Sequence, residues 1–82
     1  MKKVLMFSAS WCNPCKQAKP VFNMLAESYK NLQFEIVDID ENRDMANDFN
    51  ISGVPTFMII ENNEEVKRLV GAGNVTKLKE IL

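Results

Sequence analysis

Residues 4–15 decide how this chain folds, and they read Val4-Leu5-Met6-Phe7-Ser8-Ala9-Ser10-Trp11-Cys12-Asn13-Pro14-Cys15. The first four residues form a continuous apolar run, which is typical of a parallel strand that is covered on both faces. The small residues after this run predict a turn. Because the two cysteines follow the turn, the segment predicts a buried strand that leads into a helix with a Cys-x-x-Cys pair at its start.

A long helix is predicted from Pro14 to about Asn31. Its apolar residues recur at spacings of four, three and four, which places them on one face, and they are Ala18, Phe22, Leu25 and Tyr29. Pro20 lies inside the helix and should kink it. Residues 33–39 then predict a second strand. Residues 40–42 supply turn and capping residues for a short helix around residues 45–49.

The last third of the chain predicts a hairpin and a final helix. Residues 57–60 are an apolar strand, and Asn62-Asn63 tolerates the positive backbone angles of a hairpin turn before a returning strand at residues 66–70. Asn74 can cap a last helix. The inner face of that helix is marked by Val75, Leu78 and Leu82.

These segments predict an α/β protein with the order βαβαββα, in which three helices flank a four-stranded mixed sheet. Strands that alternate with helices indicate a parallel core, and the final hairpin adds an antiparallel edge. A length of 82 residues leaves room for a single domain, residues 1–82.

Composition excludes several classes of function. Apolar residues make up 46% and charged residues 26%, which is ordinary globular composition, and a net charge of -1 does not favour binding to nucleic acid. The apolar run Val4 to Phe7 is too short for a signal peptide or a membrane span, so we expect a cytoplasmic protein. The chain has no histidine, which excludes an imidazole base and a mixed Cys/His zinc site.

The Cys-x-x-Cys pair predicts redox chemistry. Free N–H groups and the dipole at a helix N-terminus stabilise a thiolate, so Cys12 is the expected nucleophile and should be accessible. Cys15 lies about one turn further along and can attack a mixed disulfide formed at Cys12, which makes it the expected resolving thiol. Lys16 and Lys19 are interpreted as solvated helix lysines without a catalytic role.

Two other interpretations of the pair remain open. A structural zinc site needs four ligands. Because this chain has no further Cys or His, a second molecule would have to supply the missing ligands. A purely structural disulfide is the second alternative, but it closes a loop too small to constrain the unfolded chain much.

The segment Trp11 to Lys16, Pro20, and the segment Gly53 to Thr56 together resemble the thioredoxin family, over nearly the whole chain. The resemblance implies that Pro55 is cis and lies against the active-site sulfurs, and that Val54 offers its backbone to an extended substrate. A trans proline opening a strand is the alternative. The resemblance also implies a substrate surface that includes the loop at Gly71. The supporting residues expected around the cysteines are Trp11, Pro14, Val54, Pro55 and Gly71.

Trp11 resembles the family's exposed indole beside the nucleophile, although a partly buried packing role fits nearly as well. The family usually has glycine where this chain has Asn13. The positions of its buried aspartate and of the lysine partner are Met6 and Ile36 here, so both buried charges are replaced by apolar residues. We hypothesise that Asp38, on the same strand face as Ile36, acts on the resolving thiol through water, although a solvated carboxylate is the alternative.

The chain also resembles a family member without its first strand and helix, which leaves residues 33–39 as a sheet edge that is open to self-association. The expected function is reduction of protein disulfides by a monomer that needs no cofactor, with a thioredoxin-reductase-type flavoprotein or glutathione as the electron donor. A glutaredoxin-like, glutathione-dependent enzyme is one alternative. A binding module whose thiols are incidental is the other.

Overall fold

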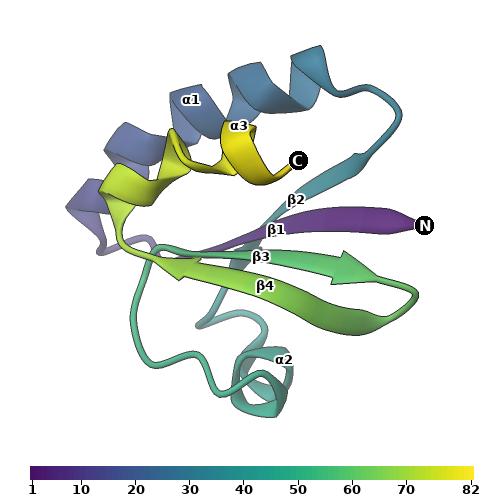
Figure 1. Ribbon diagram of the computed structural model, residues 1–82. Coiled ribbons are helices and arrows are strands. Elements are labelled where there is room, and N and C mark those ends of the chain that lie inside the picture. The colour runs from purple at the N-terminus through teal and green to yellow at the C-terminus, as the bar shows by residue number, and fades with distance from the viewer.

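The computed structural model describes residues 1–82, and the predicted order of strands and helices is confirmed (Figure 1). The elements are β1 (Lys2–Ser8), α1 (Asn13–Ser28), β2 (Gln33–Asp38), α2 (Arg43–Asp48), β3 (Thr56–Glu61), β4 (Glu64–Val70), the 3₁₀ helix η1 (Ala72–Val75) and α3 (Leu78–Ile81). None of the helices is long and apolar enough to cross a membrane.

The four strands form one mixed sheet in the order β2-β1-β3-β4, with β2 at an edge as predicted. β1 and β2 are parallel, whereas β3 is antiparallel to both β1 and β4. The parallel part of the sheet is therefore smaller than predicted. A helix of six residues rises only about 9 Å, so α2 cannot carry the chain back along a strand that spans roughly 20 Å. β3 consequently starts at the end of the sheet where β2 stops.

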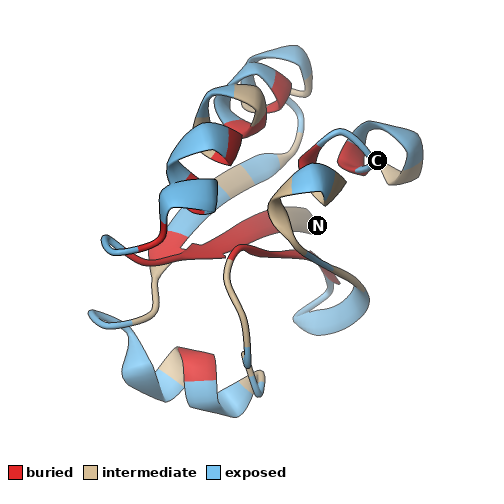
Figure 2. Ribbon diagram, turned by 90° about the vertical axis from the view of Figure 1, so that its left-hand side faces the viewer, coloured by how far each residue is buried: buried red, intermediate tan, exposed pale blue.

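The sheet is covered on both faces, which accounts for the continuous apolar run in β1. α1, η1 and α3 cover one face and α2 covers the other (Figures 1 and 2). Val4 and Met6 belong to the core cluster under α1, while Leu5 and Phe7 belong to the cluster on the α2 side. All four side chains are at most 1% exposed. Because successive side chains of β1 point to opposite faces of the sheet, the strand contributes apolar side chains to both core clusters.

α1 begins and ends close to its predicted bounds. Cys12 occupies the N-cap position in an extended conformation, and Pro14 lies in the first turn, where its missing N–H costs no helical hydrogen bond. The helix continues through Pro20, and a kink there stays a prediction. It ends at Ser28 because the N–H of Leu32 bonds to the Tyr29 carbonyl at 3.0 Å, which turns the chain toward β2.

The capping prediction is confirmed in position at Asn42, which makes no side-chain cap bond, and is wrong at Asn74. Asn42 holds the N-cap position of α2, but its side chain donates to the Asp38 carbonyl at 3.0 Å and does not accept from the helix. Asn74 lies inside η1, and its side chain donates to the Val70 carbonyl at 2.6 Å. This bond helps wind a 3₁₀ turn directly after β4.

The last helix is interrupted rather than continuous, since Thr76 and Lys77 separate η1 from α3. Val75 and Leu78 are nevertheless buried as their spacing predicts, and Leu82 is half-buried. The hairpin turn is confirmed, with φ of 52° at Asn62 and 71° at Asn63.

Candidate active site

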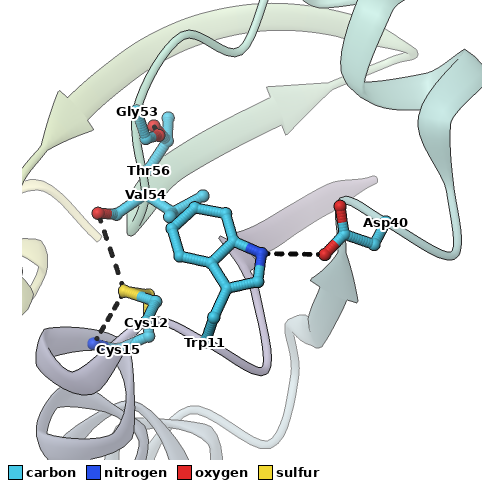
Figure 3. Close-up of a disulfide and its surroundings, with 7 residues drawn as sticks. All are labelled: Trp11, Cys12, Cys15, Asp40, Gly53, Val54 and Thr56. Carbon is cyan, nitrogen blue, oxygen red and sulfur yellow. Dashed lines mark hydrogen bonds between the residues drawn. A yellow bond between two sulfur atoms is a disulfide. The ribbon is translucent and has the colours of Figure 1, made fainter.

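Cys12 and Cys15 form a disulfide at the start of α1 (Figure 3), with 5.3 Å between their Cα atoms. The Cys15 N–H donates to the Sγ of Cys12 at 3.2 Å. This N–H is one of the helix-start donors that have no partner within the helix, so it stabilises negative charge on Cys12 when the disulfide opens. The two sulfurs therefore differ in their surroundings, as expected for a nucleophile and a resolving thiol.

The sulfurs are less exposed than the sequence suggests. Cys12 retains only 5% of its surface and Cys15 none, so the prediction of an accessible Cys12 is wrong in degree. The physical reason is the loop before β3, whose Val54 carbonyl oxygen lies 3.8 Å from the Sγ of Cys12 (Figure 3). In the reduced protein the thiol can donate to this oxygen. The loop before β3 therefore lies directly beside the sulfur that a partner must reach.

The loop before β3 is held by bonds on both sides. The Val54–Pro55 peptide bond is cis, as the resemblance implies, and the alternative of a trans proline is wrong. The Thr56 hydroxyl donates to the Gly53 carbonyl at 2.5 Å, and the Gly71 N–H donates to the Pro55 carbonyl at 2.9 Å. Gly71 has a φ of 109° and a ψ of 144°, a backbone conformation that residues other than glycine rarely adopt. The loops at Val54 and Gly71 thus form one bonded unit beside Cys12.

Trp11 stands on the surface beside the disulfide. It is 65% exposed, which confirms the exposed indole and not the packing role. Its Nε1 donates to Oδ2 of Asp40 at 2.9 Å (Figure 3). Sequence reasoning missed Asp40 as part of the site, because a turn residue 29 positions away carries no signal of this contact.

The position beneath the cysteines is apolar. Met6 is 0% exposed and shares the core cluster of Cys12 and Cys15, which confirms that an apolar side chain fills this position. Ile36, its partner in the β1–β2 register, is 39% exposed, so the expectation that both positions are buried is wrong. Ile36 lies on the edge strand β2 and is only partly covered.

Asp38 is engaged in the turn after β2. Its Oδ1 accepts from the backbone N–H of Asp40 at 2.8 Å and of Glu41 at 3.2 Å. These bonds favour a structural role for the carboxylate, while its Oδ2 accepts no hydrogen bond from the protein. The catalytic role of Asp38 stays a hypothesis.

The site contains few charged groups and no group of three or more His, Cys, Asp or Glu side chains that could hold a metal ion. The one perturbed acid lies elsewhere, on β4. The side-chain hydrogen bond from Arg68 lowers the pKa of Glu65 below its usual range. Arg68 also donates to the Phe49 carbonyl at 2.6 Å, which ties the end of α2 to β4.

A redox disulfide at a helix start, facing a cis-proline loop on a four-stranded mixed sheet, defines a protein of the thioredoxin fold. The thioredoxin family model matches residues 1–82, and the chain belongs to the thioredoxin family.

Known members support this assignment. The chain is 43% identical over 77 residues to thioredoxin H5 of Oryza sativa, covering 94% of this chain and 56% of that protein. It is 40% identical over 79 residues to a thioredoxin of Ophiophagus hannah, covering 96% and 74%. The solved thioredoxin of Fasciola hepatica superimposes with a TM-score of 0.92 at 38% identity, covering 98% of this chain and 76% of that one. The chain spans about half the length of the first curated relatives that it matches.

Proposed function

We propose that this protein is a thiol–disulfide oxidoreductase that reduces disulfides in other proteins. The observation that carries the proposal is the placement of Cys12 at the N-cap of α1, where the Cys15 N–H points at its sulfur from 3.2 Å. A thiolate at this position is the attacking species in disulfide exchange.

The cycle uses the two cysteines in sequence. In the reduced protein the Cys12 thiolate attacks a substrate disulfide, forms a mixed disulfide and releases one substrate sulfur as a thiolate. Cys15 then loses its proton and attacks the Sγ of Cys12. The bond between Cys12 and the substrate breaks, and its electron pair leaves on the second substrate sulfur. The substrate gains two electrons, and the protein ends with the disulfide that the structure contains.

The residues around the disulfide supply the substrate surface in this proposal. The Val54 backbone pairs with an extended substrate segment, and the bonded loops at Pro55 and Gly71 hold it against Cys12. Trp11 offers an exposed aromatic face beside the sulfur. Pro14 fixes the first turn of α1 between the two cysteines.

Residues 1–82 act as a single thioredoxin-like domain in this proposal, monomeric and cytoplasmic, serving electron transport and cell redox homeostasis. Its electrons come from a thioredoxin-reductase-type flavoprotein or from glutathione. The Trp11 to Lys16 segment favours the flavoprotein. Measuring turnover with NADPH and a thioredoxin reductase against turnover with glutathione and its reductase separates the two donors, and efficient use of glutathione alone assigns the glutaredoxin-like alternative.

The primary test is reduction of a disulfide-linked protein with dithiothreitol as the donor. Wild type should accelerate the reaction, Cys12→Ser should abolish the acceleration, and Cys15→Ser should accumulate the mixed disulfide, visible by mass. Lys19→Gln is a matched control at a half-buried position of α1 and should behave as wild type. A wild-type protein without acceleration contradicts the proposal and leaves the binding module as the function of the same surface.

Equilibration with graded dithiothreitol buffers gives the reduction potential, with Trp11 fluorescence as the signal because it is the only tryptophan. A potential below the cytosolic glutathione poise of about −220 to −260 mV supports a thioredoxin-like reductant. A potential within that range supports the glutaredoxin-like alternative.

A further inference from the structure

The hydroxyl of Ser8 is buried without a hydrogen-bond partner. Ser8 is 2% exposed, and its Oγ is the only buried side-chain nitrogen or oxygen in the protein that lacks a partner. A buried hydroxyl that no protein group satisfies lowers stability unless a water molecule bonds to it. Contacts within the protein therefore do not explain a serine at this position.

Ser8 lies on the face of β1 that carries the disulfide cluster. Side chains alternate along the strand, so Ser8 continues the face of Met6, two residues before it. Met6 belongs to the same core cluster as Cys12 and Cys15. Ser8 is one step closer than Met6 to the end of β1 from which the chain enters the disulfide loop.

Cys15 needs a route for its proton. Its side chain is 0% exposed, and the only buried polar residues in the protein are Ser8 and Thr56. The Thr56 hydroxyl is engaged with the Gly53 carbonyl, which leaves Ser8 as the available hydroxyl. Met6 offers only a weak thioether acceptor. The Ser8 hydroxyl both donates and accepts, which a proton relay requires.

Asp38 provides the exit from this relay. It is the partner of Ser8 in the β1–β2 register, so the two side chains lie on the same face of neighbouring strands. Both of its backbone hydrogen bonds end on Oδ1. Oδ2 is therefore free to accept, and Asp38 is only half-buried, which gives the path contact with solvent.

We infer that the Ser8 hydroxyl takes the proton of the Cys15 thiol through one bridging water and passes it toward Asp38 and solvent during resolution. Ser8 is thus a positioning residue for the cycle proposed above, on which the inference rests. As the proton leaves, Cys15 Sγ attacks Cys12 Sγ, the bond between Cys12 and the substrate breaks, and the substrate sulfur departs with the electron pair. The two cysteines are oxidised, the substrate is reduced, and the proton ends on solvent.

Few other charged groups face the relay. Lys16 follows Cys15 but is exposed on α1, and Asp40 in the turn after β2 is bonded to the Trp11 indole. No charged side chain is buried in the protein, since its only buried polar residues are Ser8 and Thr56.

The test separates attack from resolution in one stopped-flow experiment. Reduced protein is mixed with an aryl disulfide that releases a coloured thiolate twice, first on attack by Cys12 and then on resolution by Cys15. Ser8→Ala should leave the first phase unchanged and slow the second about tenfold near neutral pH, below the full range of general acid–base effects because water still competes. Ser8→Thr keeps the hydroxyl and should restore the rate. Ser10→Ala removes an exposed hydroxyl two residues away and is the matched control.

The pH profile distinguishes a relay from a structural effect. The gap between wild type and Ser8→Ala should close as the pH rises from about 6 to 9, because hydroxide then takes the thiol proton directly. An unchanged second phase in Ser8→Ala overturns the inference, as does a loss that is equal in both phases or constant with pH. Wild-type reduction of the protein disulfide is scored separately, so a failure of the proposed function remains distinguishable.

Discussion

The indole Nε1 of Trp11 donates to Oδ2 of Asp40 at 2.9 Å and thereby ties the loop before α1 to the turn after β2. The indole is 65% exposed, so this single bond orients it beside the disulfide. A hydrogen bond to a charged group is stronger than a neutral one, but water competes for it at an exposed position. The hydrogen bond therefore orients the indole ring more than it stabilises the fold.

Removing the carboxylate should release the indole. For Asp40→Ala we expect a free energy of unfolding within about 1 kcal/mol of wild type and a rise of the KM for a protein disulfide by roughly two- to fivefold. Time-resolved fluorescence anisotropy of Trp11, the only tryptophan, should show faster local motion. Asp40→Asn keeps an acceptor oxygen, so its KM and its Trp11 anisotropy should lie between those of wild type and Asp40→Ala. Unchanged anisotropy in Asp40→Ala would show that packing, not the bond, holds the ring.

Gly71 should tolerate no side chain. An added Cβ would meet its nearest neighbour, the Asn74 Nδ2, at an ordinary 3.7 Å, so space is sufficient and the backbone angle of 109° is the obstacle. We expect Gly71→Ala to lower the free energy of unfolding by about 1–3 kcal/mol in urea titrations. Gly73→Ala is the matched control, because its Cβ would meet no atom within 4 Å. It should be neutral or slightly stabilising, by less than about 1 kcal/mol. Equal losses in both variants would refute the argument from the backbone angle.

The pattern of apolar residues was sufficient to predict the strands, the first helix and the place of the cysteines, because β1 and α1 bury their apolar faces in one domain core. It was not sufficient for the end of the chain. The spacing of Val75 and Leu78 fits a 3₁₀ turn as well as an α-helix, and the choice depends on the bond from the Asn74 side chain to the Val70 carbonyl. That bond exists only once β4 is in place.

The site was predictable in its chemistry and less so in its surroundings. The Cys-x-x-Cys pair and the resemblance led to Cys12, Cys15 and the cis bond at Pro55. Neither led to the low exposure of Cys12, because that depends on where a loop from a distant part of the chain comes to lie. The unpartnered Ser8 hydroxyl was equally invisible, since a serine at the end of a strand looks like a turn residue until its burial is known.

Glu65 should make stability depend on pH in the acid range. Its pKa is lowered by the hydrogen bond from Arg68, so the native state binds a proton at Glu65 more weakly than the unfolded state does. The stabilisation is fully present above the ordinary value of 4.5 and is lost as the pH falls through the lowered pKa of the folded state. Urea midpoints of wild type should therefore fall more steeply below that pH than those of Glu65→Gln. Glu61→Gln, at a carboxylate whose contact with Lys2 is a loose 4.0 Å, is the control substitution.

Alkylation of the reduced protein should be confined to Cys12. Cys12 as a whole residue keeps 5% of its surface exposed, and a helix-start N–H at its sulfur favours the reactive thiolate, whereas Cys15 has no exposed surface. With iodoacetamide and peptide mass analysis, we expect Cys12 to react at least about 100-fold faster than Cys15 in the folded state, since reaction at Cys15 requires local opening. In concentrated urea the two rates should converge, which controls for intrinsic differences between the peptides. Because the Val54 loop lies beside the Cys12 sulfur, folding should slow the reaction of Cys12 with a bulky maleimide more than its reaction with iodoacetamide. Comparable labelling of both cysteines in the folded protein would mean that Cys15 is open to solvent, and its proton would then need no relay through Ser8.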